Sequence, residues 1–130
     1  MEVLSSRVLI RPRDFEASRH FWCDQVGLRI YREYGTGGRR TGVVLFCGGG
    51  FLELTVAGPG PDEAPGPVTL WLQVPDVAVE VARLRQQGVE VGDAETMPWG
   101  LKEAWTADPD GVAVVLVEVP EGHPIRTRLE

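Results

Sequence analysis

The stretch "RVLIRPRDFEASRHFW", residues 7–22, decides the fold because it returns in altered form as "TLWLQVPDVAVEVARL", residues 69–84. Each stretch begins with alternating residues, passes through a Pro and an Asp, and continues with apolar residues at helical spacing. The two starts are 62 residues apart, and so are Asp14 and Asp76. A fixed offset of this kind predicts two copies of one structural unit.

Each copy is expected to contain one strand, one helix and three further strands. Asp14 and Asp76 suit N-cap positions, where a carboxylate accepts free backbone N–H groups, and Gly27 and Gly88 suit helix ends. Three extended segments, separated by turn residues, follow each predicted helix. They are "LRIYREY", "TGVVLFC" and "GFLELTV" in the first copy, and "VEVGDAE", "LKEAWTA" and "GVAVVLVEV" in the second.

These elements predict an α+β fold made of two tandem βαβββ modules. We expect a single domain over residues 1–130, with module 1 at about 5–56 and module 2 at about 68–119. A linker rich in Pro and Gly, residues 57–67, joins them, and residues 120–130 form a C-terminal tail. One module cannot cover both faces of its own strands, so a cup-shaped mixed sheet with the helices outside is expected to enclose a cleft.

The composition limits the partners that the chain can take. The 130 residues carry a net charge of −6, which argues against nucleic acid or an anionic membrane as a partner. No segment approaches the roughly 20 apolar residues of a membrane-spanning helix, and the first residues do not resemble a signal peptide, so a cytoplasmic protein is expected. Cys23 and Cys47 fit neither a Cys-x-x-Cys motif nor a disulfide framework.

The tandem modules, the "FW…VGL" segment after Asp14, the "PWG" of residues 98–100 and the "DPDG" of residues 108–111 resemble one family. This is the glyoxalase, bleomycin-resistance and extradiol-dioxygenase superfamily, also called vicinal oxygen chelate proteins. The resemblance implies a homodimer whose cavities are completed by both subunits. Enzymes of the family hold a divalent metal at four strand positions, whereas its binding proteins hold a drug without a metal.

By this resemblance, the four ligand positions fall on Arg7, Glu53, Thr69 and Val115. Only Glu53 has a side chain that suits a metal, and Arg7 brings a permanent positive charge that opposes a cation. His20 falls in the first predicted helix and His123 near the C-terminus, where both are expected to face solvent. We therefore expect no metal and no other cofactor.

Strand alternation extends this set to one face of each module. The residues expected to face the cleft are Leu9, Arg11, Phe51, Thr55, Trp71, Gln73, Ala113 and Val117. Those expected to face the helices are Val8, Ile10, Leu52, Leu54, Leu70, Leu72, Val114 and Leu116. The mixed face is either a small-molecule site or simply a solvated surface.

The tryptophans favour a ligand. Trp71 and Trp99 suit either a core or a binding role, whereas core packing is expected for Trp22 and Trp105. Flat aromatic walls suit a flat aromatic guest. If Arg7 and Glu53 point inward, they form a buried ion pair in which Arg7 donates to a ligand oxygen and Glu53 orients it.

The leading hypothesis is a metal-free protein that sequesters a bulky aromatic antibiotic or natural product, without catalytic residues. One alternative is a lyase, isomerase or dioxygenase whose metal Glu53 recruits; another is a metal-free enzyme with Glu53 as general base. Loops 35–42 and 57–68 are expected to shape the pocket. The predicted ligand-binding residues are Arg7, Leu9, Phe51, Glu53, Thr69, Trp71, Trp99 and Val115.

Overall fold

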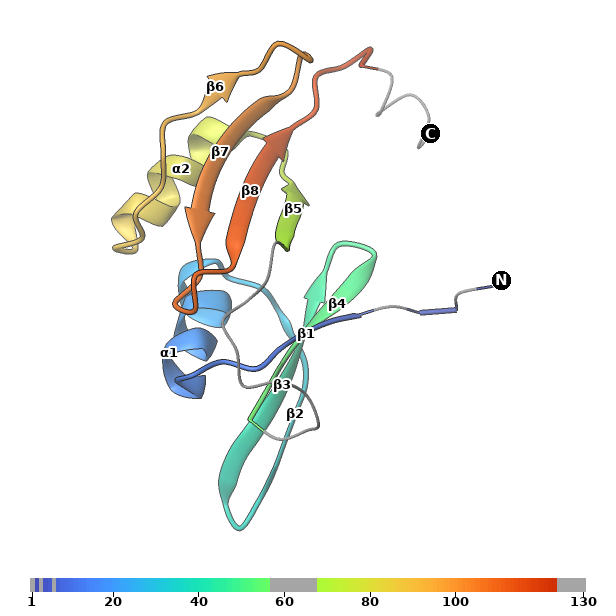
Figure 1. Cartoon of the computed structure of the whole chain (residues 1–130), viewed down its shortest axis with the longest axis vertical. Helices are drawn as coiled ribbons and strands as arrows, with labels where there is room; N and C mark the ends of the chain where they lie inside the picture. The colour runs from blue at the N-terminus through green and yellow to red at the C-terminus, as the bar shows by residue number, and fades with distance from the viewer. Residues whose placement is uncertain (1, 3, 6, 57–67, 124–130) are drawn as a thin grey trace. The chain divides into compact units, whose positions relative to one another are not determined.

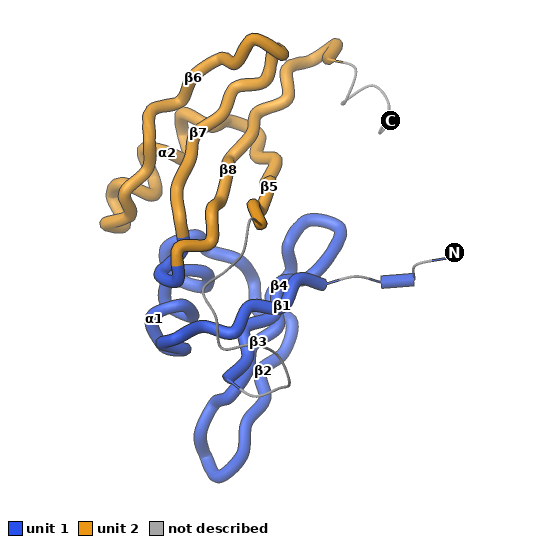
Figure 2. The backbone as a smooth tube through the Cα atoms, in the orientation of Figure 1, with its two compact units in different colours: residues 1–65, 108–110 blue, residues 66–107, 111–130 orange. Residues whose placement is uncertain are grey.

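The computed structural model describes residues 2, 4–5, 7–56 and 68–123. The chain divides into two compact units (Figure 2), the first made of residues 1–65 and 108–110 and the second of residues 66–107 and 111–130. The predicted linker, residues 57–67, and residues 124–130 of the predicted tail lie outside the described residues. A cleft enclosed by both modules therefore stays a prediction, and each unit is described by itself.

The first unit has the predicted βαβββ order (Figure 1). Its sheet runs β1-β4-β3-β2, with β1 parallel to β4 and the other pairs antiparallel. The first helix continues directly into a π-helical segment, η1. The elements are β1 (Arg7–Ile10), α1 (Phe15–Arg19), η1 (His20–Gln25), β2 (Ile30–Thr36), β3 (Arg39–Cys47) and β4 (Gly50–Thr55).

The second unit repeats this arrangement. Its sheet runs β5-β8-β7-β6, and β5 is again parallel to the last strand of the unit. The elements are β5 (Thr69–Gln73), α2 (Val77–Gln86), β6 (Glu95–Thr96), β7 (Lys102–Ala107) and β8 (Ala113–Glu118). The same order in both units confirms the α+β fold with two tandem βαβββ modules.

The helix ends follow the sequence signals. Asp14 accepts a hydrogen bond from the backbone N–H of Ala17 at 3.0 Å, and Asp76 accepts one from that of Val79 at 3.2 Å. Both Asp residues are extended N-caps, as predicted. Within the described residues, no helix has the length and apolar character that a membrane span requires.

Each unit buries the face of its sheet that packs against its helix. In the first unit Leu52 and Leu54 are buried, and Trp22 of η1 is fully buried with its ring edge-on to Phe21 at 4.9 Å. In the second unit Val114 and Leu116 of β8 are buried on the side of α2. Their burial agrees with the predicted helix-facing side, although Val115 and Val117 at the alternate positions of β8 are buried as well, and core packing is confirmed for Trp22. Val8 differs, because it is 42% exposed on the short outer strand β1.

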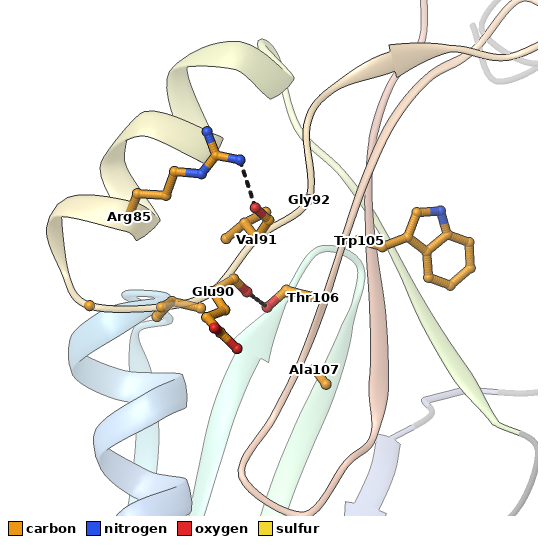
Figure 3. Close-up of a pocket in the computed structure, with 9 residues that line it drawn as sticks. Arg85, Glu90, Val91, Gly92, Trp105, Thr106 and Ala107 are labelled. Atoms are coloured by element: carbon orange, nitrogen blue, oxygen red, sulfur yellow. Dashed lines mark hydrogen bonds between the residues drawn. The ribbon is translucent and has the colours of Figure 1, made fainter.

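The predicted strand over residues 89–95 is largely wrong, because only Glu95–Thr96 forms a strand there. One backbone hydrogen bond to β7 remains, from the Gly92 N–H to the Trp105 carbonyl at 2.9 Å, and side chains supply other partners. The Val91 carbonyl accepts from Arg85 at 2.7 Å, and the Glu90 carbonyl accepts from the Thr106 hydroxyl at 2.7 Å (Figure 3). The backbone is thus satisfied without forming a regular strand.

Segment 35–42 is a continuous hairpin rather than a loop. Strands β2 and β3 are joined by Gly37 and Gly38, whose φ angles are 61° and 74°. Two successive positive φ values are what a type I′ hairpin turn requires, and glycine adopts them without a steric penalty.

Candidate functional site

Arg7 and Glu53 form the predicted ion pair on neighbouring parallel strands. Arg7 of β1 pairs in register with Phe51 of β4, and Leu9 pairs with Glu53. The Arg7 Nη1 donates to Glu53 Oε1 at 2.6 Å. The pair is only half buried, because the side chain of Arg7 is 43% exposed and that of Glu53 is 13% exposed. The predicted burial is therefore only partial, and it is greater for the carboxylate than for the guanidinium.

Tyr34 is a third member of this group that sequence reasoning missed. Its hydroxyl donates to Glu53 Oε2 at 2.6 Å. Its ring lies over Gly42, the residue opposite it in β3, and occupies the space that a Cβ at position 42 would take. A glycine within β3, directly before its apolar run, signals this close approach, since strand glycines often mark a place where another group comes near.

The hydrogen bonds decide the charge state of the group. Partial burial acts to raise the pKa of Glu53, but the hydrogen bonds from Tyr34 and Arg7 outweigh it and hold the pKa below its ordinary value. The pKa of Tyr34 is raised, mainly by burial and then by its bond to Glu53. At neutral pH the group is therefore a guanidinium, a carboxylate and a neutral phenol.

Three aromatic rings lie beside this group on the same face of the sheet. Tyr31 stacks with Phe46 at 5.2 Å and with Phe51 at 5.1 Å between ring centroids, and Phe46 and Phe51 lie 5.7 Å apart. The guanidinium carbon of Arg7 lies 5.7 Å from the Phe51 ring centroid. We call Tyr31, Phe46 and Phe51 the aromatic patch. Leu9, also predicted for this site, is 58% exposed.

An irregular register in β2 gives the patch its composition. Ile30 pairs with Leu45 and Arg32 pairs with Val44, so two steps along β2 oppose one step along β3. This β-bulge breaks the alternation and lets Tyr31 share a face with Tyr34, three residues away. Sequence reasoning named Phe51 but missed Tyr31, because regular alternation cannot anticipate a bulge. It missed Phe46 because it assigned no face to β3, although Phe46 pairs in register with Phe51.

The second unit exposes two indole rings on either side of one small residue. Trp71 of β5 and Trp105 of β7 both pair in register with Val115 of β8. Trp71 is 46% exposed and Trp105 is 49% exposed. Val115 itself is buried in a cluster whose other members are Leu101, Val117 and Val119. We call Trp71 and Trp105 the indole pair.

The expectation of core packing for Trp105 is wrong. Ala104, its neighbour in β7, is buried, whereas the indole of Trp105 points away from the side chain of Arg85 on α2 (Figure 3). Alternation therefore places Trp105 on the helix-free face together with Trp71. Thr69, also predicted for this site, is exposed at the start of β5.

Trp99 lies in the turn before β7 and is held at two points. Its indole Nε1 donates to Glu103 Oε2 at 2.8 Å, and its backbone carbonyl accepts from His123 Nε2 at 3.0 Å. Glu103 is buried and was missed, although it stands two residues before Trp105 and so shares its face. His123 was expected to face solvent, but its ring contacts this turn instead.

A shallow depression of about 810 Å³ lies between the end of α2 and β7 (Figure 3). Two of its polar side chains, Arg85 and Thr106, already donate to backbone carbonyls. Trp105 is the one aromatic residue among those that line the depression, and its indole points away from it. The depression is therefore a less favourable ligand site than the helix-free faces.

The donor set does not fit a metal centre. Of the four positions matched to metal ligands, only Glu53 carries a carboxylate, and both of its oxygens accept hydrogen bonds from Arg7 and Tyr34. Among the described residues, no three His, Cys, Asp or Glu side chains are grouped so that they could hold an ion. The side chains at these four positions therefore do not suit the divalent metal that the resemblance assigns to the enzymes of this family.

Two tandem βαβββ units define the class of fold, and the family follows from comparison with known proteins. The family described as Glyoxalase/Bleomycin resistance protein/Dioxygenase superfamily matches residues 5–116, and the chain belongs to this superfamily. A search of curated proteins finds no match.

Several solved structures share the fold. TnmS3, an antibiotic binding protein from Streptomyces sp. CB03234, is 24% identical with a TM-score of 0.73 over 92% of this chain and 98% of its own. A glyoxalase/bleomycin resistance protein from the same strain is 26% identical, with a TM-score of 0.66 over 86% and 97%. A lactoylglutathione lyase from Agrobacterium tumefaciens is 19% identical, with a TM-score of 0.67 over 91% and 94%. A binding protein and an enzyme thus share this fold, so the side chains must decide between them.

Proposed function

We propose that the chain is a metal-free binding protein that sequesters a bulky aromatic antibiotic or natural product. The observation that carries this proposal is that each sheet exposes aromatic side chains on the face its helix leaves open. The aromatic patch does so in the first unit, and the indole pair does so in the second. Contiguous exposed apolar surface of this kind is typical of binding sites.

The spacing of the indole pair suits one flat ring. Neighbouring strands lie about 4.8 Å apart, so the backbones of Trp71 and Trp105, with β8 between them, are separated by roughly 10 Å. A ring stacked between two indoles needs about 7–8 Å, twice the separation of carbon atoms in contact. Side-chain rotation can supply the difference.

The structure argues against Glu53 as a general base. A base must accept a proton from its substrate, but both Glu53 oxygens already accept hydrogen bonds from protein donors. Its lowered pKa makes the carboxylate a weaker base than an ordinary glutamate. Binding without chemistry is therefore the better use of this group. TnmS3, which shares the fold, is described as an antibiotic binding protein, and this agrees with the proposal.

Calorimetric titration with bleomycin, doxorubicin and the neutral ring compound 9-anthracenemethanol tests the proposal. We expect saturable binding of at least one compound, weakened about tenfold or more by Trp71→Ala or Trp105→Ala, because each change removes one stacking surface. Val79→Ala is the control, since Val79 is also an exposed apolar residue but lies on α2. The bound compound should be recovered chemically unchanged.

Two results would contradict the proposal. Absence of saturable binding to the whole panel would remove the aromatic-binding role. Conversion of a compound, or near-stoichiometric zinc, iron, manganese or nickel in protein purified without chelator, would favour an enzyme. The homodimer expected from the family resemblance and the cytoplasmic location stay predictions, and light scattering at several protein concentrations would test the first.

A further inference from the structure

We propose that the helix-free face of the first unit selects aromatic ligands that carry an anionic group, which Arg7 binds. The inference rests on the proposed function, because it names the chemical class of the ligand. Suitable groups are a carboxylate, a sulfonate or an ionised phenol attached to a flat ring. Three features support it: the local charge, the donors of Arg7 and the position of the aromatic patch.

The charges around Glu53 leave this face locally positive. Arg7 pairs with the carboxylate, and the guanidinium carbon of Arg32 lies 5.4 Å from the centroid of the Tyr34 ring. Both arginines act on Glu53, since each contributes to the lowering of its pKa. Two guanidiniums thus surround one carboxylate on a chain whose net charge is −6. An anion is attracted to this face although the protein as a whole is acidic.

Arg7 retains donors for a second partner. A guanidinium has five N–H groups, and Arg7 uses Nη1 for Glu53. Within the described part of the chain, this is the one hydrogen bond that its side chain makes. Its Nε and Nη2 form the planar edge that binds a carboxylate or sulfonate through two parallel hydrogen bonds. The 43% exposure of the side chain leaves room for such a partner.

The aromatic patch lies where the rest of such a ligand would be. Phe51 is in contact with the guanidinium of Arg7 and also stacks with Tyr31. A ring that stacks on the exposed surface of the patch therefore places its substituents beside the guanidinium. The aromatic patch would thus contact the ring of such a ligand while Arg7 binds its anionic group.

Glu53 acts here as a positioning residue rather than as a contact for the ligand. It fixes Arg7 through one oxygen while Tyr34 fixes its other oxygen, so the guanidinium is oriented before a ligand arrives. Its negative charge also moderates the attraction. Glutamine at position 53 keeps an amide oxygen that can accept from Arg7, so Glu53→Gln removes the charge without removing the positioning acceptor and should strengthen anion binding.

Three anthracene probes that differ only in the substituent at ring position 9, which is anionic, neutral or cationic, test the proposal. They are anthracene-9-carboxylate, 9-anthracenemethanol and 9-(aminomethyl)anthracene, titrated at pH 7 and low salt. We expect the carboxylate to bind about tenfold or more tightly than the alcohol, as a charge-assisted bidentate contact provides, and the amine to bind most weakly. Glu53→Gln should raise the affinity for the carboxylate probe about threefold or more, whereas Glu80→Gln on α2 makes the same change of net charge and should not.

The double variant Arg7→Gln with Glu53→Gln removes the guanidinium without leaving an unpaired carboxylate. It should lose the preference for the carboxylate probe and keep its affinity for the alcohol. The matched control is the double variant Glu80→Gln with Arg83→Gln, which removes an Arg–Glu ion pair on α2 and also leaves the net charge unchanged. Equal binding of all three probes, or an equal loss of the preference in this control, would overturn the inference and leave the proposed function standing. If none of the three probes binds, the inference fails, and the proposed function fails with it only if bleomycin and doxorubicin do not bind either.

Discussion

The phenol ring of Tyr34 occupies the space above Gly42 that any other residue would fill with its Cβ. The two residues face each other across β2 and β3, and the ring reaches past Gly42 to place its hydroxyl on Glu53. Because Gly42 of β3 has no side chain, Tyr34 of β2 can reach across β3 and donate to Glu53 of β4. Position 42 is consequently part of the site, although it carries no functional group.

Gly42→Ala should displace Tyr34 and break its hydrogen bond to Glu53. We expect a loss of about 1–3 kcal/mol in the free energy of unfolding, from steric overlap and a lost charge-assisted hydrogen bond. Urea denaturation measures it. Gly49→Ala is the control, because no atom lies within 4 Å of a Cβ built there and the position has no positive φ. A Gly42→Ala variant as stable as the wild type would show that the ring is not held as described.

Acid should destabilise the protein partly through Glu53. Because its pKa is lower in the folded protein than the ordinary value of 4.5, ionised Glu53 stabilises the fold at higher pH. That contribution is present above the ordinary glutamate pKa and is lost as the pH falls through and below it. The difference in unfolding free energy between wild type and Glu53→Gln should therefore shrink from pH 7 toward pH 3. The unfolding free energy of the Tyr34→Phe variant should depend less on pH than that of the wild type over the same range. A pH-independent difference would contradict this origin.

Substitution of Trp22 should lower the free energy of unfolding more than substitution of any other tryptophan. Trp22 is 0% exposed, and its indole Nε1 lies 3.4 Å from Asp108 Oδ2. Trp22→Phe should cost about 1–3 kcal/mol in unfolding free energy, because it leaves a cavity and removes a buried donor. Trp71→Phe should cost less than about 0.5 kcal/mol, as is usual for an exposed position. Acrylamide quenching should also lose its protected component only in the Trp22→Phe variant.

Glu103 should restrain the indole of Trp99. Replacing Glu103 by Leu removes the acceptor of the Trp99 Nε1 hydrogen bond, so the half-exposed indole should gain rotational freedom. In protein labelled with 5-fluorotryptophan, the ¹⁹F resonance of Trp99, assigned by its loss in Trp99→Phe, should shift and narrow. Glu103→Gln keeps an acceptor oxygen and should preserve the wild-type spectrum. Identical spectra for the Leu and Gln variants would show that this bond does not hold the ring.

The repeat and the helix caps were predictable because they depend on local signals. Asp14 and Asp76 carry capping oxygens at equivalent places, and this fixed the order of elements in both units. The choice of Arg7 and Glu53 followed from the family resemblance, and the repeat offset agreed with it, since Val115 lies 62 residues after Glu53. The repeat and the caps can be predicted without knowledge of the exact strand register, whereas the inward direction of Arg7 and Glu53 depends on it.

The rest of the site depends on register and on contacts distant in sequence. Tyr34 meets Glu53 only because β2 and β3 pair as they do, and Tyr31 joins the patch only because β2 is irregular. Trp105 was predicted to lie in the core because the sequence alone did not show which face of β7 packs against the helix. Residues 89–95 were predicted to form a strand from their residue pattern. The side chains that bind their backbone instead, such as Arg85, leave no local signal in the sequence.

The irregular strand β2 also bears on the solubility of the protein. It is the outermost strand of its sheet order, and its register shifts twice along its length. An outer strand that is regular and apolar invites pairing with other chains, whereas bulges and charged residues such as Arg32 and Glu33 discourage it. The bulge that brings Tyr31 to the patch thus also protects against edge-to-edge aggregation, so straightening β2 to strengthen the sheet would weaken binding and favour precipitation together.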